Sequence, residues 1–516
     1  MSKESAQPAG EYSLCALSMM SDCGNLVHIL IDFFYNYFAD FVVTLQQNYK
    51  NNKIMQGFNK GFIYFICLVS AMGGLLFGYD WVVIGGAKPF YELYFGIADS
   101  ATDQGLAMTI ALIGCMIGAC TCGWLADKIG RKKLLIVSAI IFFVSAILTG
   151  VFSTFPTFLV ARFFGGIGIG IASGLSPMYI AEVAPTQIRG KLVSLNQMTI
   201  VIGILAAQIV NWQIADPIPE GFTPADIAAS WNGQMAWRWM FWAAAVPAAV
   251  FLVLAFFIPE SPRWQAMKGL TAQADRTLTK IGGASYAQTE LQAIADANAD
   301  AKQQAGLGTL FSKPFHKVLL LGIVIAVFQQ WCGTNVIFNY AQEIFQSAGY
   351  SVGDVLFNIV ITGVANVVFT LVAIFTVDKL GRRALMLIGA GGLCLTYTIL
   401  GCCYYMHITG FFMIILVVCA IACYAMTLGP CTWVLISELF PNRVRAIAVA
   451  TCTFALWIGS STLTYTFPLL NKGLGSYGTF WIYALVCGCG FVFFLMRLPE
   501  TKGKSLEQLE KELVKG

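Results

Sequence analysis

Charge is scarce in this sequence. Only 11% of its 516 residues are Asp, Glu, Lys or Arg, whereas 58% are hydrophobic. A chain with so few charged residues lacks the polar surface that a soluble enzyme of this length needs. Apolar runs long enough to cross a hydrocarbon core of ~30 Å recur almost throughout, which is typical of a polytopic membrane protein. Because these runs do not alternate as the strands of a membrane barrel do, they predict helices.

Residues that would indicate an enzyme are also missing. The three histidines, His28, His316 and His407, do not have the spacing of a metal site. The sixteen cysteines lie mostly in apolar runs, so we expect small buried side chains and no disulfide framework. The stretch GGIGIG at 165–170 resembles a phosphate loop, but no strand precedes it, which favours close helix packing. We therefore expect no enzyme activity, no cofactor and no nucleic-acid partner.

Twelve membrane-spanning helices are predicted, which makes the fold an all-α membrane protein. Their approximate bounds are 61–87, 104–126, 134–152, 157–180, 191–214, 237–258, 317–345, 355–377, 384–405, 410–436, 446–469 and 478–498. Lys and Arg concentrate in alternate loops, which the positive-inside rule assigns to the cytoplasm. Both termini and the polar loop 259–316 are therefore predicted to be cytoplasmic. Within that loop we expect short amphipathic helices in QADRTLTKI and YAQTELQAIADANADAKQQ.

The two halves of the chain repeat each other. GWLADKIGRK (123–132) reappears as FTVDKLGRRA (375–384), AEVAPTQIRG (181–190) as SELFPNRVRA (437–446), and PESPRW as PETKGK. The offsets agree with one duplication. Two parallel six-helix repeats are a transporter architecture, with the substrate site at their interface near the midplane of the membrane.

The duplication defines the predicted domain organisation. An N-terminal extension, a six-helix half, a cytoplasmic linker, a second six-helix half and a cytoplasmic tail cover residues 1–57, 58–258, 259–316, 317–498 and 499–516, respectively. Within the extension, Leu26–Gln47 is apolar but carries Asp32 and Asp40, which a helix places roughly on one face. An interfacial helix is one interpretation. An upstream start that the cell does not use, with translation beginning at Met55, is another.

Several motifs together resemble one family. DKIGRK, PMYIAEVAPTQIRGK, PESPRW, DKLGRR, SELFPNRVR and PETKGKSLEQLE look like the sugar-porter family of the major facilitator superfamily, and most like its bacterial xylose–proton symporters. The resemblance covers roughly residues 58–510 and leaves out the N-terminal extension. It implies the major facilitator fold, in which two halves expose a central site alternately to either side of the membrane. It also implies a monomeric sugar carrier in a plasma membrane, the inner membrane in a bacterium.

Asp80 lies inside the first predicted span, in the stretch LLFGYDWVV. A lone carboxylate costs ~2.5–3.5 kcal/mol there on insertion scales, so a function is expected. Arg162 is the only other charged residue deep inside a span of the first half, and is its expected partner. Burial favours the protonated acid and the guanidinium favours the carboxylate, so a pair that opens and closes binds and releases a proton. A static buried ion pair is the alternative. The resemblance favours coupling, because proton symporters of the family have Asp at this point of the FGYD motif, whereas passive facilitators typically have Asn.

A sugar site needs amides, which both donate and accept hydrogen bonds, and aromatic rings for the apolar sugar face. The seventh span contains AVFQQWCGTNVIFNYAQ, in which Gly333–Thr334 is predicted to unwind the helix locally. By resemblance to the family, the expected substrate-binding residues are Phe77, Gln197, Gln329, Gln330, Asn335, Asn339, Asn366, Trp433 and Trp457. Each one has a structural alternative, which is a helix–helix hydrogen bond for an amide and core packing for a tryptophan.

Three positions depart from the pattern of the xylose symporters. Ile204, on the helix face of Gln197, stands where they have a second Gln. Asn339 replaces a Tyr, and Leu456 replaces a Gln. These differences change the contacts available to sugar hydroxyls, so the sequence leaves open which pentose or hexose is carried.

Charged motifs at the cytoplasmic ends of the spans predict a gate. In both halves acidic residues recur beside basic ones, and we expect ion pairs between the halves in the outward-open state. The residues concerned are Asp127, Arg131, Glu182, Arg189, Glu260, Arg263, Asp378, Arg382, Glu438 and Arg445. Ordinary positive-inside bias is the alternative, since surface ion pairs are individually weak.

The sequence therefore predicts a twelve-helix carrier that takes up a monosaccharide together with a proton by alternating access. Its expected partners are the monosaccharide, the proton as coupling ion and the lipid bilayer. A facilitator in which Asp80 is structural is one alternative. A sugar sensor on the same scaffold is another, although a longer cytoplasmic extension than the sixteen residues after Glu500 is expected of a sensor.

Overall fold

The structure is a computed structural model that describes residues 57–219, 221–301, 315–348, 352–440 and 444–502. All of these residues except Gly57 belong to one compact unit, Phe58–Gly516. The predicted interfacial helix Leu26–Gln47 lies outside the described residues, as do most of the N-terminal extension and of the cytoplasmic tail.

Helices make up almost all of the described chain, and no strand occurs in it. Eleven helices in these ranges are long and apolar enough to cross a membrane. The last of them, within α20 (Arg445–Arg497), contains non-helical backbone at Gly475 (φ 69°, ψ 174°), so that it folds as two spans joined by a turn. The chain thus has the twelve spans that the sequence predicts.

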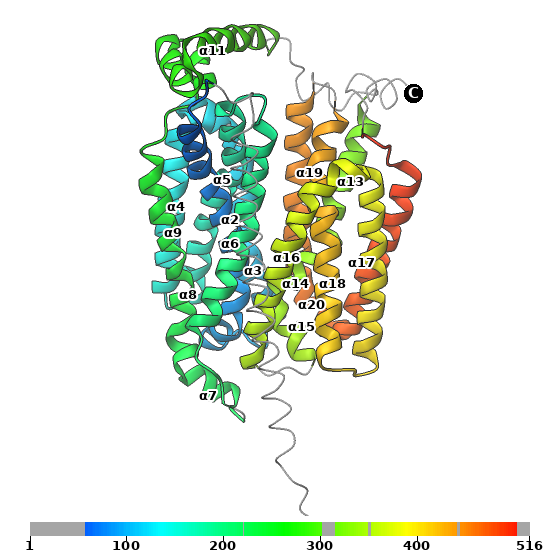
Figure 1. The fold of residues 1–516 in the computed structure, drawn as a ribbon. Helices are drawn as coiled ribbons and strands as arrows, with labels where there is room; N and C mark the ends of the chain where they lie inside the picture. The colour runs from blue at the N-terminus through cyan, green and yellow to red at the C-terminus, as the bar shows by residue number, and fades with distance from the viewer. Residues whose placement is uncertain (1–56, 220, 302–314, 349–351, 441–443, 503–516) are drawn as a thin grey trace, which may run out of the picture. The chain divides into compact units, whose positions relative to one another are not determined.

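The first half holds six spans, drawn in blue to green in Figure 1. They are α2 (Lys60–Phe95), α3 (Ala101–Ile129), α4 (Arg131–Val151), α5 (Phe155–Val183), α6 (Arg189–Ile214) and a sixth made of η2 (Asn232–Ala236), α8 (Trp237–Ala243) and α9 (Ala245–Ala255). A short helix, α7 (Pro224–Ala229), precedes the sixth span. It begins at a capping box, in which Thr223 and Asp226 each bond the other's backbone N–H.

The linker and the second half follow. The linker contains α10 (Pro262–Met267) and α11 (Thr271–Ala301), and Gly283 divides α11 into two pieces where the sequence predicts two amphipathic helices. The second half consists of α13 (His316–Trp331), α14 (Thr334–Asn339), α15 (Ala341–Ser347), α16 (Val352–Leu380), α17 (Arg382–Tyr405), α18 (Phe411–Met426), α19 (Leu428–Leu439) and α20.

Two boundaries differ from the prediction. The span predicted at 410–436 is broken at Thr427, whose φ of −128° and ψ of −84° are not helical. Pro430 explains the break, because a proline ring clashes with the carbonyl of the residue four positions earlier. The first span continues to Phe95 instead of ending near 87, because Lys88 is buried among carboxylates and therefore does not mark the membrane surface.

Helices α3 and α5 approach each other closely because glycines line their contact. A Cβ atom on Gly166 would lie 2.0 Å from the carbonyl oxygen of Ala111, and one on Gly170 would lie 2.2 Å from that of Cys115. Only glycine fits at such positions, as is common where membrane helices pack. The predicted role of GGIGIG in helix packing is confirmed.

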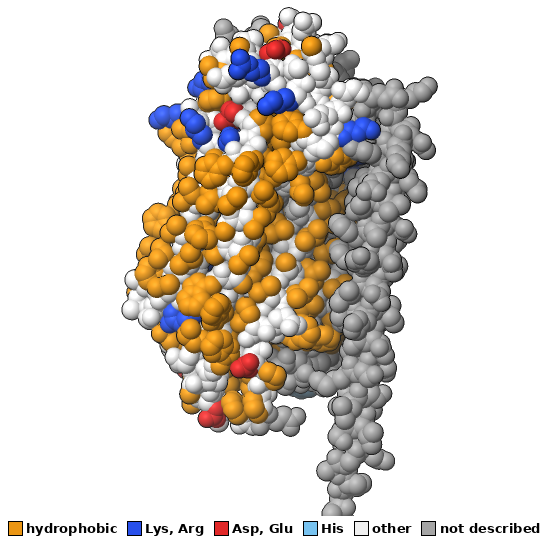
Figure 2. Space-filling model, turned by 60° about the vertical axis from the view of Figure 1, so that its left-hand side comes forward, with side chains coloured by type: hydrophobic (Ala, Val, Ile, Leu, Met, Phe, Trp, Pro, Cys, Tyr) orange, Lys and Arg blue, Asp and Glu red, His pale blue; other side chains and the backbone are white. Residues whose placement is uncertain are grey.

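Four helix pairs join the two halves. Helix α3 contacts α20, α6 contacts α16, and α2 contacts both α14 and α15. The linker helix α11 lies at one end of the bundle, and α7 and α15 lie at the other (Figure 1). Figure 2 shows a broad band of hydrophobic side chains over the visible face of the first half, with Lys and Arg gathered beyond the band at the α11 end. This band matches what a lipid-facing surface requires.

Candidate functional site

A buried ion pair joins α2 and α5. Nη1 of Arg162 donates a hydrogen bond of 2.5 Å to Oδ1 of Asp80, and the two side chains are only 4% and 9% exposed. The predicted partnership of these residues is therefore present. The pair is held through one guanidinium nitrogen, and within the described residues Nε of Arg162 has no hydrogen-bond partner. A single bond is easier to open than the two parallel bonds of which arginine and carboxylate are capable.

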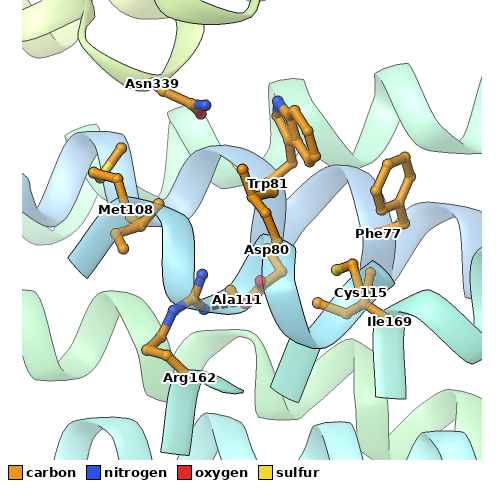
Figure 3. Close-up of a pocket in the computed structure, with 11 residues that line it drawn as sticks. Phe77, Asp80, Trp81, Met108, Ala111, Cys115, Arg162, Ile169 and Asn339 are labelled. Carbon is orange, nitrogen blue, oxygen red and sulfur yellow. Dashed lines mark hydrogen bonds and ion pairs between the residues drawn. The ribbon is translucent and has the colours of Figure 1, made fainter. Parts of the chain in front are cut away.

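The pair opens onto a small cavity between the two halves (Figure 3). Most of its lining comes from α2, α3 and α5. Asn339, at the end of α14, is contributed by the second half. The complete lining is Phe77, Asp80, Trp81, Ile84, Met108, Ala111, Leu112, Cys115, Arg162, Ile169 and Asn339. Asn339 is 4% exposed and its Oδ1 has no protein partner in the described chain, so this oxygen is an unused acceptor beside the cavity.

Two aromatic rings of the lining pack against a third ring from the second half. Phe77 and Trp81 stand one helical turn apart on α2, with ring centroids 5.5 Å apart. Trp457 from α20 closes the group, at 6.1 Å from Phe77 and 6.2 Å from Trp81. Rings from both halves therefore meet beside the ion pair. Such rings provide the apolar surface on which the flat face of a small polar molecule can lie.

A chain of amides follows the break in the seventh span. Gly333 has φ 85° and separates α13 from α14, which confirms the predicted unwinding. Across this break Asn335 donates to Gln330, Gln330 donates to Oε1 of Gln329 at 2.6 Å, and Gln329 donates to the hydroxyl of Tyr424 at 2.9 Å. Each amide in the chain is oriented by its neighbour, so the remaining donors and acceptors of the group are fixed in direction.

The other three predicted sugar ligands lie on separate helices. Gln197 is half-buried on α6, and Asn366 is 5% exposed on α16. Trp433 is 42% exposed on α19 and does not line the cavity. Their role toward a substrate stays a prediction.

The charged motifs of the first half form one compact cluster. Nε and Nη2 of Arg131 each bond Glu182 at 3.0 Å, and Nη1 lies 2.9 Å from the exposed Asp127. Oε1 of Glu260 accepts the backbone N–H groups of Arg131 and Lys132 at 2.8 and 3.1 Å. Glu260 thus acts as the cap of α4, whose own cap residue is a glycine without a side chain.

The second half repeats this arrangement. Nη2 of Arg382 lies 3.1 Å from Glu438. Glu500 accepts the backbone N–H groups of Arg382 and Arg383 at 3.0 and 3.2 Å, and so caps α17 as Glu260 caps α4. Burial alone would raise the pKa of Glu500, but hydrogen bonds from Lys502, Arg382 and Arg383 hold that pKa below its usual range.

The remaining gate residues take other positions. Arg189 lies 3.4 Å from the hydroxyl of Thr186, Arg263 is exposed, and Nε of Arg445 donates to the carbonyl of Phe440 at 3.1 Å. The side chain of Asp378 lies outside the described part. Glu182 and Glu438 are paired with arginines of their own half. Pairing between the halves, expected of the outward-open state, stays a prediction.

Sequence reasoning missed three residues of these clusters. Trp81 follows Phe77 by four positions, and this spacing on a helix was enough to place it on the same face. Glu500 corresponds to Glu260 in the repeat of PESPRW as PETKGK, so the repeat itself was the signal. Tyr424 had no such signal, because only the folded chain brings α18 beside Gln329.

Two repeated six-helix halves, a cavity lined from both and a buried ion pair beside it define a secondary transporter of the membrane. A family model described as "Sugar (and other) transporter" matches residues 66–513, and the chain belongs to this family. The resemblance to sugar porters is thereby confirmed.

Individual relatives are similar over almost their whole length. The D-xylose-proton symporter of Escherichia coli (strain K12) is 37% identical, over 88% of this chain and 96% of the relative. The arabinose-proton symporter of Bacillus subtilis (strain 168) is 35% identical, over 90% and 98%. The structure is similar to the inward-open conformation of the xylose transporter XylE from E. coli, with a TM-score of 0.77, 35% identity and coverage of 88% and 100%.

Proposed function

We propose that this protein takes up a monosaccharide together with a proton by alternating access. The observation that carries the proposal is the Asp80–Arg162 pair at the wall of a cavity between the halves. Relatives named as xylose– and arabinose–proton symporters, at 37% and 35% identity, support the same function. The proton is the coupling ion, and no further cofactor is required.

Proton binding follows from two opposed effects on Asp80. Burial disfavours the carboxylate, and the guanidinium of Arg162 favours it. While the pair is closed, the guanidinium of Arg162 lies against the carboxylate of Asp80. When the pair opens, the buried carboxylate loses its counterion and takes up a proton, and closing the pair expels that proton. One hydrogen bond has to break in this step.

Sugar and proton are linked through α2. This helix carries both Asp80 and the rings of Phe77 and Trp81, so a sugar packed on the rings constrains the helix that holds the acid. Asn339 offers its free oxygen to a sugar hydroxyl. The amides from Gln329 to Asn335 add donors and acceptors at the helix break. Gln197, Asn366 and Trp433 complete the proposed site.

The α11 end of the bundle is the proposed cytoplasmic end. Lys and Arg gather there, and short loops rich in these residues stay on the cytoplasmic side during insertion. Both chain termini are then cytoplasmic, and the α7–α15 end is extracellular. We propose the plasma membrane as the location. We propose the monomer as the working unit, since residues from both halves of one chain line the cavity.

Uptake into proteoliposomes tests the function. Labelled xylose, arabinose, glucose and galactose are offered with and without an inward proton gradient, to the wild type and to Asp80→Asn. We expect accumulation of one or more of these sugars that requires the gradient and disappears in Asp80→Asn. Asp99→Asn is the matched control, because Asp99 is an exposed acid of the loop after α2.

Each outcome separates the candidate functions. Equilibration without a gradient, equal in wild type and Asp80→Asn, would contradict coupling and identify a facilitator. Sugar binding without any flux would indicate a sensor. Retained exchange of labelled for unlabelled sugar in Asp80→Asn would locate the defect in the proton step.

A further inference from the structure

A second group of buried charges lies at the α7–α15 end of the bundle. Lys88, on α2, is only 2% exposed, and its Nζ lies 2.9 Å from Oε1 of Glu92 one turn further along the same helix. The same Nζ contacts Oε1 of Glu343, which belongs to α15 in the other half. Lysine is rarely buried so completely unless it is paired.

Among the described residues, the carboxylates of Glu92 and Glu343 are the counterions of Lys88. Its ammonium group lies 5.4 Å from the centre of the Tyr340 ring, which is also buried. Tyr91 on α2 directs its hydroxyl to the sulfur of Met108 on α3 at 3.4 Å. The next arginine on this side, Arg238, bonds the carbonyl of Gly150 at 2.6 Å. Lys88 therefore holds one acid of its own half and one acid of the other half.

We propose that Lys88, Glu92 and Glu343 form a latch that closes the extracellular end, and that Glu92 takes over Lys88 when the latch opens. This inference rests on alternating access between the two halves. The halves can separate at this end only if Lys88 leaves Glu343. A buried cation left without any partner is strongly unfavourable. Because Glu92 stays on the helix of Lys88, the lysine keeps a counterion in both states.

The two glutamates should therefore have opposite effects on one lysine. Removing the charge of Glu343 removes the contact between the halves and favours the open end. Removing the charge of Glu92 leaves Glu343 as the only acid bound to Lys88 and favours the closed end. Lys88, Glu92 and Glu343 act here as positioning residues, since none of them lines the central cavity.

Hydrogen exchange on the full chain in lipid nanodiscs, without sugar, tests the latch. Glu343→Gln and Glu92→Gln are matched variants, because each replaces one carboxylate by an isosteric amide at the same lysine. In peptides that cover 85–95 and 334–348 we expect exchange about tenfold faster in Glu343→Gln and slower than wild type in Glu92→Gln. Exchange in α17, remote from the latch, should not change in either variant.

Transport kinetics provide the second measurement. Glu92→Gln should lower the turnover number several-fold while the KM for sugar stays within about twofold, because the cavity is untouched. Faster exchange in both variants would overturn the latch and leave a merely stabilising ion-pair cluster. No change in either variant would overturn it as well. Since exchange is measured without sugar, a protein that fails to transport sugar can still confirm or overturn the latch.

Discussion

Replacing Gly166 by alanine should separate α3 from α5 and disable the central ion pair. The added Cβ would lie 2.0 Å from the carbonyl oxygen of Ala111, whereas real Cβ atoms stay at least 3.0 Å from such neighbours. The two helices must therefore move apart by about 1 Å. The obstacle is backbone, so no change of rotamer relieves it. Overpacking of this kind costs ~1–3 kcal/mol, and a backbone clash belongs at the upper end, ~3 kcal/mol.

Gly174→Ala on the same helix is the matched control. Its Cβ would lie 3.5 Å from the sulfur of Cys122, which is an ordinary van der Waals contact. Alanine is preferred over glycine inside a helix by ~0.5–1 kcal/mol, so this variant should be neutral or slightly stabilised. The two substitutions add the same methyl group to one helix, so the gain in helix propensity is common to both, and we expect them to differ in stability by about 3 kcal/mol.

Unfolding of the solubilised protein with increasing SDS measures this difference, and uptake measures its consequence. Arg162 stands one turn before Gly166 on α5, so a shift of α5 should also displace the guanidinium from Asp80. We expect Gly166→Ala to lose both stability and proton-driven uptake, and Gly174→Ala to keep both. Equal unfolding midpoints for the two variants would refute the reasoning from helix contact.

Three further changes test the site and its frame. Asn339→Ala should raise the KM for sugar about fivefold with little effect on the SDS midpoint, because one hydrogen bond of ~1 kcal/mol is lost; an unchanged KM would mean that this oxygen does not meet the sugar. Gly333→Ala should lower the free energy of unfolding by at least ~1–2 kcal/mol, because φ is 85° and the Cβ would lie 2.8 Å from Cγ of Tyr483. An equally stable variant with normal sugar binding would contradict a fixed break. Glu500→Gln should lower the thermal midpoint at pH 7. The pKa of this acid is held below 4.5 in the folded protein, so its charged form stabilises the fold above that pH. The difference in thermal midpoint between wild type and variant should therefore narrow as the pH falls below 4.5. A difference in midpoint that does not depend on pH would exclude this role.

Features set by local sequence could be predicted. Spans of apolar residues, the local unwinding at Gly333–Thr334 and the glycine contact of α5 depend on the residues themselves, and all three are confirmed. The pairing of Asp80 with Arg162 was also accessible, although 82 residues separate them, because charge is so scarce inside the spans that few partners exist.

Features set by distant contacts could not be predicted in the same way. The first span was predicted to end near residue 87, just before Lys88, since an unpaired lysine belongs at the membrane surface. The partner of Lys88, Glu343, lies 255 residues away, at the end of a predicted span, where an acid is unremarkable. The break at Thr427 was indicated by Pro430, but its position depends on how α18 and α19 pack.

The ion pairs are distributed unequally along the bundle. At the α7–α15 end Lys88 and Glu343 join the two halves, and Nζ of Lys472 donates to the carbonyl of Asp99 across the same boundary at 3.1 Å. At the α11 end the described pairs of Arg131 with Glu182 and of Arg382 with Glu438 lie within one half each. Pairs within a half can persist while the halves rock, whereas pairs between halves have to break. The conformation captured here is therefore held at its α7–α15 end. When the α7–α15 end opens, the stabilisation from the Lys88–Glu343 contact is lost. New contacts between the Arg131–Glu182 cluster and the Arg382–Glu438 cluster at the α11 end would offset that loss.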